Sequence, residues 1–137
     1  MKILAAVIVL AAGASTGQCT PAPQNECGVE LRGLEVHHGR VTDTLTVWCS
    51  KRPEEHLFQY WLDYKGPGEE FTRLSPRVPS VYDIPSVEGY TRTVSADCVK
   101  GWYQTHYVAT GVSSAGIAFD FESTGWRKFF DVEDCAA

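Results

Sequence analysis

The chain has 137 residues, which is enough for one domain with a modest hydrophobic core. Acidic residues outnumber basic ones by 17 to 12, for a formal net charge of −5. This balance, with no basic run, excludes nucleic acid and anionic lipid surfaces as expected binding partners.

The first 18 residues have the pattern of an export signal. Lys2 precedes an uncharged apolar run over residues 3–12, and small residues follow it. The run is too short to span a bilayer as a helix. Cleavage is expected after Ala14, at an A-x-A site, or before Cys19. We therefore assign residues 1–18 to a signal peptide and expect an exported protein, secreted or anchored to the outer face of the membrane.

Residues 19–27 form a Pro-rich stretch that suits a tether between an anchor and a domain. Cys19 opens this stretch, and three interpretations of it stay open. It is a lipid attachment site of the bacterial lipoprotein kind, a free or intermolecular thiol, or a disulfide partner that leaves another cysteine unpaired. Lipidation would explain the odd cysteine count, because four cysteines would then remain.

Export favours disulfide bonds among the remaining cysteines, which are Cys27, Cys49, Cys98 and Cys135. Four cysteines can pair in three ways. Cys49 and Cys98 each adjoin a predicted core strand, whereas Cys27 and Cys135 bracket the domain. We therefore expect the pairs Cys49–Cys98 and Cys27–Cys135. The wide spacing, with no C-x-x-C, does not suggest a zinc knuckle.

Residues 28–137 show short alternating runs separated by turn residues, a pattern typical of β-strands. Beyond Gly33 the apolar alternation continues on the other parity, which predicts a β-bulge there. The run at 56–65 is apolar on both faces and predicts a central strand. The expected strands cover residues 29–36, 41–49, 56–65, 89–98, 102–111, 117–122 and 126–132, with a possible short one at 71–74. About seven such strands predict an all-β sandwich, disulfide-bonded, over residues 28–137.

Two resemblances support this class of fold. Trp61 follows Cys49 by twelve positions on the presumed next strand, which resembles the disulfide and tryptophan of an immunoglobulin core. Over residues 41–122, the segments LTVWCSKRPEEH, YTRTVSADCVKGWYQTHYVATG and GIAFDF resemble small exported proteins of Actinobacteria and their phages. The resemblance implies an exported immunoglobulin-like or fibronectin III-like domain. It implies no assigned activity and no catalytic residue.

Motifs for catalysis or metal binding are not recognisable. His37 and His38 are adjacent, and neighbouring strand residues point to opposite faces, so the pair does not chelate one ion. His56 and His106 lie outside any zinc-binding spacing. The segment 111–116 is one residue too long for G-x-S-x-G and is interpreted as a turn. We expect no enzyme, no cofactor and no metal.

The aromatic residues give the strongest indication of binding. Trp61 and Trp102 lie on predicted strands whose aromatic residues cannot all be interior if one face is solvated, and exposed Trp favours protein interfaces. Tyr82 and Ile84 are unusual in a Pro-rich loop that is fully solvated. Ordinary packing, between the sheets or of the loop over the sandwich edge, is the alternative for both pairs.

These observations predict an exported, non-enzymatic binding protein whose partner is another protein or a cell-envelope component. Two alternatives remain. One is a phage-encoded envelope protein that blocks superinfection, which the resemblance and the possible anchor suggest. The other is a small secreted hydrolase, which would need a pocket with convergent His and carboxylate groups.

Overall fold

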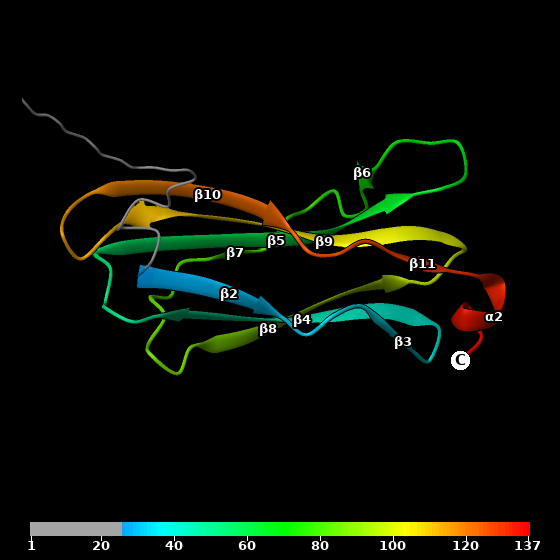
Figure 1. Ribbon diagram of the computed structural model, residues 1–137, viewed down its shortest axis with the longest axis horizontal. Coiled ribbons are helices and arrows are strands. Elements are labelled where there is room, and N and C mark those ends of the chain that lie inside the picture. The colour runs from blue at the N-terminus through cyan, green and yellow to red at the C-terminus, as the bar shows by residue number, and fades with distance from the viewer. Residues whose placement is uncertain (1–25) are drawn as a thin grey trace, which may run out of the picture.

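A computed structural model describes residues 26–137, which form two antiparallel β-sheets stacked face to face (Figure 1). The all-β prediction is therefore confirmed. The elements are β2 (Cys27–Leu31), β3 (Glu35–His37), β4 (Arg40–Cys49), β5 (Glu55–Lys65), β6 (Thr72–Arg73), β7 (Ser80–Val81), β8 (Tyr90–Asp97), β9 (Gly101–Val112), β10 (Ala118–Thr124), β11 (Lys128–Phe130) and α2 (Val132–Cys135). The four long strands β4, β5, β8 and β9 agree with the predicted runs to within one residue at each end.

The larger, six-stranded sheet has the order β10-β9-β5-β6, with β11 also beside β9 and β7 also beside β5. Its centre is the long β5–β9 pair, which runs in unbroken register from Glu55 opposite Val112 to Lys65 opposite Trp102. The expectation that residues 56–65 form a central strand is confirmed, because β5 has neighbours on both sides.

The smaller, four-stranded sheet places β4 between β8 on one side and β2 and β3 on the other. Leu31 lies opposite Leu45, and Glu35 lies opposite Thr42. The chain therefore advances four residues on one strand and three on the other, which is the one-residue excess of a β-bulge. Gly33 lies in this segment with φ at 116°, a conformation that glycine adopts without a steric penalty.

The core fills the space between the two sheets. The strict alternation of β4 turns Val41, Leu45 and Val47 inward, where none of them is exposed. They pack against the inward side chains of the larger sheet, including Phe58, Leu62, Tyr103 and Tyr107. The burial of apolar surface in this layer is the main stabilising contribution to the fold.

One buried carboxylate joins the two sheets within this core. Asp43 on β4 is 3% exposed. Its Oδ1 accepts hydrogen bonds from the backbone N–H groups of Gly33 and Thr44, at 2.9 and 2.8 Å. Its Oδ2 accepts the hydroxyl of Thr105 on β9 at 2.5 Å. The carboxylate therefore fixes the bulge and ties it to the opposite sheet.

The disulfide pairing that the sequence suggested is wrong. Cys27 bonds to Cys49, and Cys98 bonds to Cys135. Because β2 pairs directly with β4, Cys27 lies opposite Cys49 in register and becomes its nearest sulfur. All four cysteines named from the sequence are disulfide-bonded. Cys27, at the end of the expected tether, is the first residue of β2.

The immunoglobulin-type packing of a disulfide against Trp61 is not formed. Trp61 projects from the outer face of β5, and the Cys49 disulfide remains within the smaller sheet instead of bridging the two sheets. The resemblance therefore fails at this detail of the core.

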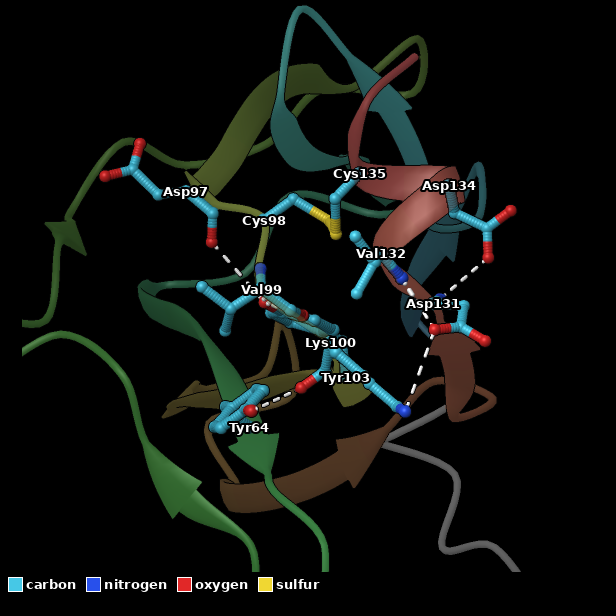
Figure 2. Close-up of a disulfide and its surroundings, with 10 residues drawn as sticks. All are labelled: Tyr64, Asp97, Cys98, Val99, Lys100, Tyr103, Asp131, Val132, Asp134 and Cys135. Atoms are coloured by element: carbon cyan, nitrogen blue, oxygen red, sulfur yellow. Dashed lines mark hydrogen bonds and ion pairs between the residues drawn. A yellow bond between two sulfur atoms is a disulfide. The ribbon is translucent and has the colours of Figure 1, made fainter.

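The second disulfide holds the C-terminal helix against the connection between β8 and β9 (Figure 2). Figure 2 also shows the Tyr103 hydroxyl, which accepts from Val99 N at 2.9 Å and lies 3.0 Å from Val99 O. Tyr64 donates its hydroxyl to Lys100 O at 2.6 Å. Gly101 is required here, because a Cβ would lie 2.5 Å from the Tyr64 ring. The expected strand at 126–132 is shorter than predicted, because the chain turns into α2 after β11.

The predicted signal peptide, most of the tether and Cys19 lie outside the described residues. Within residues 26–137, no helix has the length and apolar character required to cross a membrane.

Candidate functional site

The outer face of the six-stranded sheet carries a row of polar and aromatic side chains from β5 and β9. Because side chains alternate along a strand, the core takes one set from β5 and β9 and the outer face takes the other. Register then places Trp61 beside His106 and Asp63 beside Gln104. The outer set comprises Leu57, Gln59, Trp61, Asp63 and Lys65 from β5, and Trp102, Gln104, His106, Val108 and Thr110 from β9.

A connected polar cluster lies at the middle of this outer face. We define it as Trp61, Asp63, Gln104, His106 and Glu122. Asp63 is 7% exposed, and its two oxygens accept from Trp61 Nε1 at 2.8 Å and Gln104 Nε2 at 3.1 Å. His106 Nδ1 lies 2.9 Å from Asp63 Oδ2, and its Nε2 lies 2.5 Å from Glu122 Oε2. The indole of Trp61 stacks on the His106 ring at 4.3 Å.

This cluster fixes its side chains and leaves little freedom for proton transfer. A general base needs a ring nitrogen that can accept a proton from the reacting group. Both nitrogens of His106 already face carboxylates, and both contacts are hydrogen bonds only when each nitrogen carries a proton. The arrangement therefore holds Trp61 and His106 rigidly on the surface, which suits a contact platform.

A second cluster combines exposed aromatic rings with guanidinium groups at one end of the same face. This aromatic–arginine cluster consists of Phe71, Arg73, Trp102, Arg127 and Phe129. Arg127 lies 5.7 Å from the Phe71 ring and 6.0 Å from the Trp102 ring. Trp102 in turn packs against Phe129 at 5.4 Å, and each of these two residues is 37% exposed.

Arg73 joins the two clusters, since its guanidinium lies 6.0 Å from the Trp61 ring. Among residues 26–137, neither Arg73 nor Arg127 forms an ion pair with a carboxylate. Both guanidinium groups lie within about 6 Å of aromatic rings, a cation–π distance, while their N–H donors stay available. The recess between the clusters has a volume of about 590 Å³, and it is lined by Trp61, Asp63, Phe71, Arg73, Leu74, Ser75, Pro76 and His106.

The opposite end of the face is acidic. Tyr82 and Ile84 border a groove of about 660 Å³ with the acidic residues Glu54, Glu55 and Asp120. Tyr82 is 72% exposed, and Ile84 is partly buried. We call this region the acidic groove. Glu54, Glu55 and Asp120 thus lie at the start of β5, whereas Lys65, Arg73 and Arg127 lie near its other end.

The four residues named from the sequence as binding candidates fall into two groups. Trp61 belongs to the polar cluster and Trp102 to the aromatic–arginine cluster, whereas Tyr82 and Ile84 line the acidic groove. The structure does not bring the two pairs into one pocket. His37 and His38 are exposed near the turn after β3, and His37 Nε2 lies 2.7 Å from Glu35 Oε1.

Arg73, Arg127, Asp63 and His106 were not identified as site residues from the sequence. The spacing Trp61-x-Asp63, together with Gln104-x-His106 on the next long strand, is the signal that could have found part of the cluster, because both pairs point to one face. Arg127 follows Trp126, which is 96% exposed in the connection between β10 and β11. The sequence placed Arg127 in the expected strand at 126–132, whereas in the structure it lies in the connection before β11.

His56 differs from the other histidines because it points into the core. It is 4% exposed, and neither ring nitrogen has a hydrogen-bond partner in the described part of the chain. Burial lowers the pKa of its imidazole below the ordinary value of 6.5. His56 and His106 therefore do not meet, since one lies inside the sandwich and the other outside.

No family model, curated protein or solved structure matches this chain.

Proposed function

We propose that this protein is exported and acts, without catalysis, by binding another protein through the outer face of its six-stranded sheet. The observation that supports the proposal is the aromatic–arginine cluster. Exposed Trp and Arg side chains dominate the binding energy of protein interfaces. Here Arg127 lies 6.0 Å from the Trp102 ring and Arg73 lies 6.0 Å from the Trp61 ring.

The chemistry of the cluster favours a partner that presents carboxylates. Guanidinium groups bind carboxylates through paired, charge-assisted hydrogen bonds, and both arginines of the cluster lack such a partner in the described residues. An acidic segment of the partner would bind beside Arg73 and Arg127, because the carboxylates of the acidic groove would repel it. This polarity would fix the orientation of the partner.

The hydrolase alternative has less support. His106 with Asp63 has the geometry of a positioned base, but Glu122 occupies the other ring nitrogen. Ser75, which lines the recess, donates its hydroxyl to Arg77 O at 2.7 Å instead. The same face would also suit binding to a cell-envelope component, or a phage-encoded role at the envelope. Identifying the partner distinguishes these alternatives.

For the fold, we propose an immunoglobulin-like or fibronectin III-like sandwich. If β2/β3, β6/β7 and β10/β11 are each counted as one interrupted strand, the sandwich has seven strands. The order is then β2/β3, β4, β8 in one sheet and β10/β11, β9, β5, β6/β7 in the other. That arrangement supports a Greek-key sandwich of this class. The position of Trp61 and the disulfides distinguish it from an antibody-type core.

The experiment places a photo-crosslinking residue at Trp102 in the full chain, produced in its own host, and at Thr93 of the other sheet as the control. We expect one discrete protein adduct from position 102 and none from position 93. The partner is then identified by mass spectrometry and purified for direct binding measurements.

Arg73→Ala and Arg127→Ala should each weaken this binding by about tenfold or more. The matched control is Arg92→Ala, since Arg92 also stacks on a ring, 4.5 Å from Tyr90, but belongs to the smaller sheet. Adducts at both positions, or equal losses from all three variants, would refute the proposal.

A further inference from the structure

The Cys27–Cys49 disulfide and His56 form a compact group at one end of the core, away from the outer face. Cys27 begins β2 and Cys49 ends β4, whereas His56 comes from β5 in the opposite sheet. The two sulfurs and an imidazole nitrogen all lie within 4.8 Å of one another. Cys49 is 1% exposed and His56 4% exposed, whereas Cys27 is partly buried at the start of β2.

His56 has no structural explanation within the described residues. An unpaired polar group in a core is destabilising, and native cores pair nearly all of theirs. Among residues 26–137, neither nitrogen of His56 has a hydrogen-bond partner, and the imidazole lies 5.9 Å from the Phe119 ring. A buried imidazole that no protein group satisfies is suited to a ligand that is not part of the chain.

A small cavity adjoins the group. Its volume is about 20 Å³, which is room for one water molecule. Apart from the sulfur of Cys27 and the ring of His56, the side chains around it are apolar. The full lining is Cys27, Gly28, Val29, His56, Ala109, Phe119 and Phe121.

We propose that the reduced form of this group is a zinc site, with Cys27 and Cys49 as thiolate ligands, His56 as the imidazole ligand and a water in the cavity as the fourth. Sulfur and imidazole are the donors that Zn²⁺ prefers, in a tetrahedral arrangement. Such a site spaces its donors about 3.5–3.8 Å apart, and the three ligand atoms already lie within 4.8 Å of one another. Two thiolates also neutralise the charge of Zn²⁺, which a buried apolar site requires.

The site is closed by oxidation, because a disulfide sulfur is not a thiolate and does not bind zinc. Opening it needs two electrons from a thiol or phosphine reductant. With a thiol, two RSH molecules convert the disulfide to two cysteine thiols and become RSSR. Zinc then displaces the two thiol protons. The spacing along the chain could not show this site, since its ligands meet only across the two sheets.

The test isolates this pair of cysteines from the others. The 27/49 chain is the full chain with Cys19→Ser, Cys98→Ser and Cys135→Ser. The matched control, the 98/135 chain, carries Cys19→Ser, Cys27→Ser and Cys49→Ser and retains His56. Both are reduced with a phosphine without oxygen. They are then titrated with Zn²⁺ against a chromophoric chelator, and with Co²⁺ as a spectroscopic probe.

We expect the reduced 27/49 chain to bind one Zn²⁺ and its oxidised form to bind none. Co²⁺ should give the absorption of a tetrahedral site with two thiolates. His56→Phe in the 27/49 chain should weaken zinc binding by at least about 100-fold, because losing even an outer-shell partner costs about 10–100-fold. Zinc binding no tighter than in the 98/135 chain, or no effect of His56→Phe, would overturn the proposal.

The unsubstituted chain supplies a second measurement if either variant fails to fold. The ring ¹⁵N shifts of His56 are followed by NMR during addition of Zn²⁺, with and without the phosphine. We expect a coordination shift at one ring nitrogen only with the reductant. Unchanged His56 shifts in the reduced, folded chain would also overturn the proposal.

Discussion

The outer faces of the two sheets differ in composition, although the strands of both sheets pair in regular antiparallel register. On the smaller sheet, register sets Thr42, Thr44 and Thr46 of β4 beside Ser95, Thr93 and Thr91 of β8. On the larger sheet the outer positions of β5 and β9 carry Trp61, His106 and Trp102, and the two arginines lie beside these rings. Threonine suits a solvated strand and needs no further explanation.

This contrast separates the requirements of folding from those of binding. A sandwich of this size needs buried inner faces, and both sheets provide them. The threonine-rich face carries Trp48, and its Arg40 is paired with Asp97, whereas Arg73 and Arg127 of the larger sheet have no carboxylate partner within residues 26–137. The aromatic–arginine cluster is therefore the part of the molecule for which function is the better explanation. Four predictions compare the stability contributions of the core and of the two faces.

The largest effect is expected in the core that both faces share. Asp43→Ala removes the acceptor of two partly buried backbone N–H bonds and of the buried Thr105 hydroxyl. We expect a loss of about 3 kcal/mol in the free energy of unfolding, measured by urea denaturation. A loss below about 1 kcal/mol would show that Asp43 does not join the sheets.

A smaller effect is expected for the carboxylate of the polar cluster on the outer face. Asp63→Ala leaves Trp61, Gln104 and His106 without their acceptor, but water can reach these groups at the surface. We expect about 1–2 kcal/mol by the same denaturation. If Asp63→Ala destabilised the protein more than Asp43→Ala does, the outer face would be part of the folding core.

His56 should make the fold sensitive to mild acid. Burial lowers its pKa in the folded protein below 6.5, so the unfolded chain binds a proton first as the pH falls. The stabilising contribution is complete above pH 6.5 and declines below it, by at most about 1.4 kcal/mol per pH unit. His56→Phe should flatten the dependence of unfolding free energy on pH between about 7 and 5. Parallel curves for the two proteins would contradict this.

The smallest effect is expected on the threonine-rich face. Thr44→Ala and Thr93→Ala each remove an outward hydroxyl on neighbouring positions of β4 and β8. We expect changes within about 0.5 kcal/mol, which is usual for surface sites. Losses as large as that of Asp63→Ala would remove the difference between the faces.

The sequence predicted the fold more fully than the site. Alternation in β4, β5, β8 and β9 identifies the strands, because a buried face imposes a period of two. The disulfide partners depend on which strands become neighbours, and alternation does not contain that information. Helix α2 has only four residues and depends on a capping box between Asp131 and Asp134, too short a signal to separate from strand β11.

For the site, Trp61 and Trp102 could be predicted because each lies on a long strand with surplus aromatic residues. Arg73 and Arg127 lie within the expected strands at 71–74 and 126–132, but nothing in those short runs showed that their side chains would lie over aromatic rings. Their positions over the rings follow from the packing of loops and not from any local period. The position of His56 beside Cys27 and Cys49 could not be predicted either, because it depends on how the two sheets stack.

Hydroxyl-radical footprinting tests most directly whether the outer face of the six-stranded sheet is the binding surface. The labelling of Trp102 and Phe129 is compared between the purified protein and the protein in the host that produces it. Trp48, on the outer face of β4, serves as the internal reference. We expect Trp102 and Phe129 to be protected several-fold in the host while Trp48 is labelled equally in both samples. Equal labelling of all three residues, or protection of Trp48 alone, would contradict the assignment of the binding face.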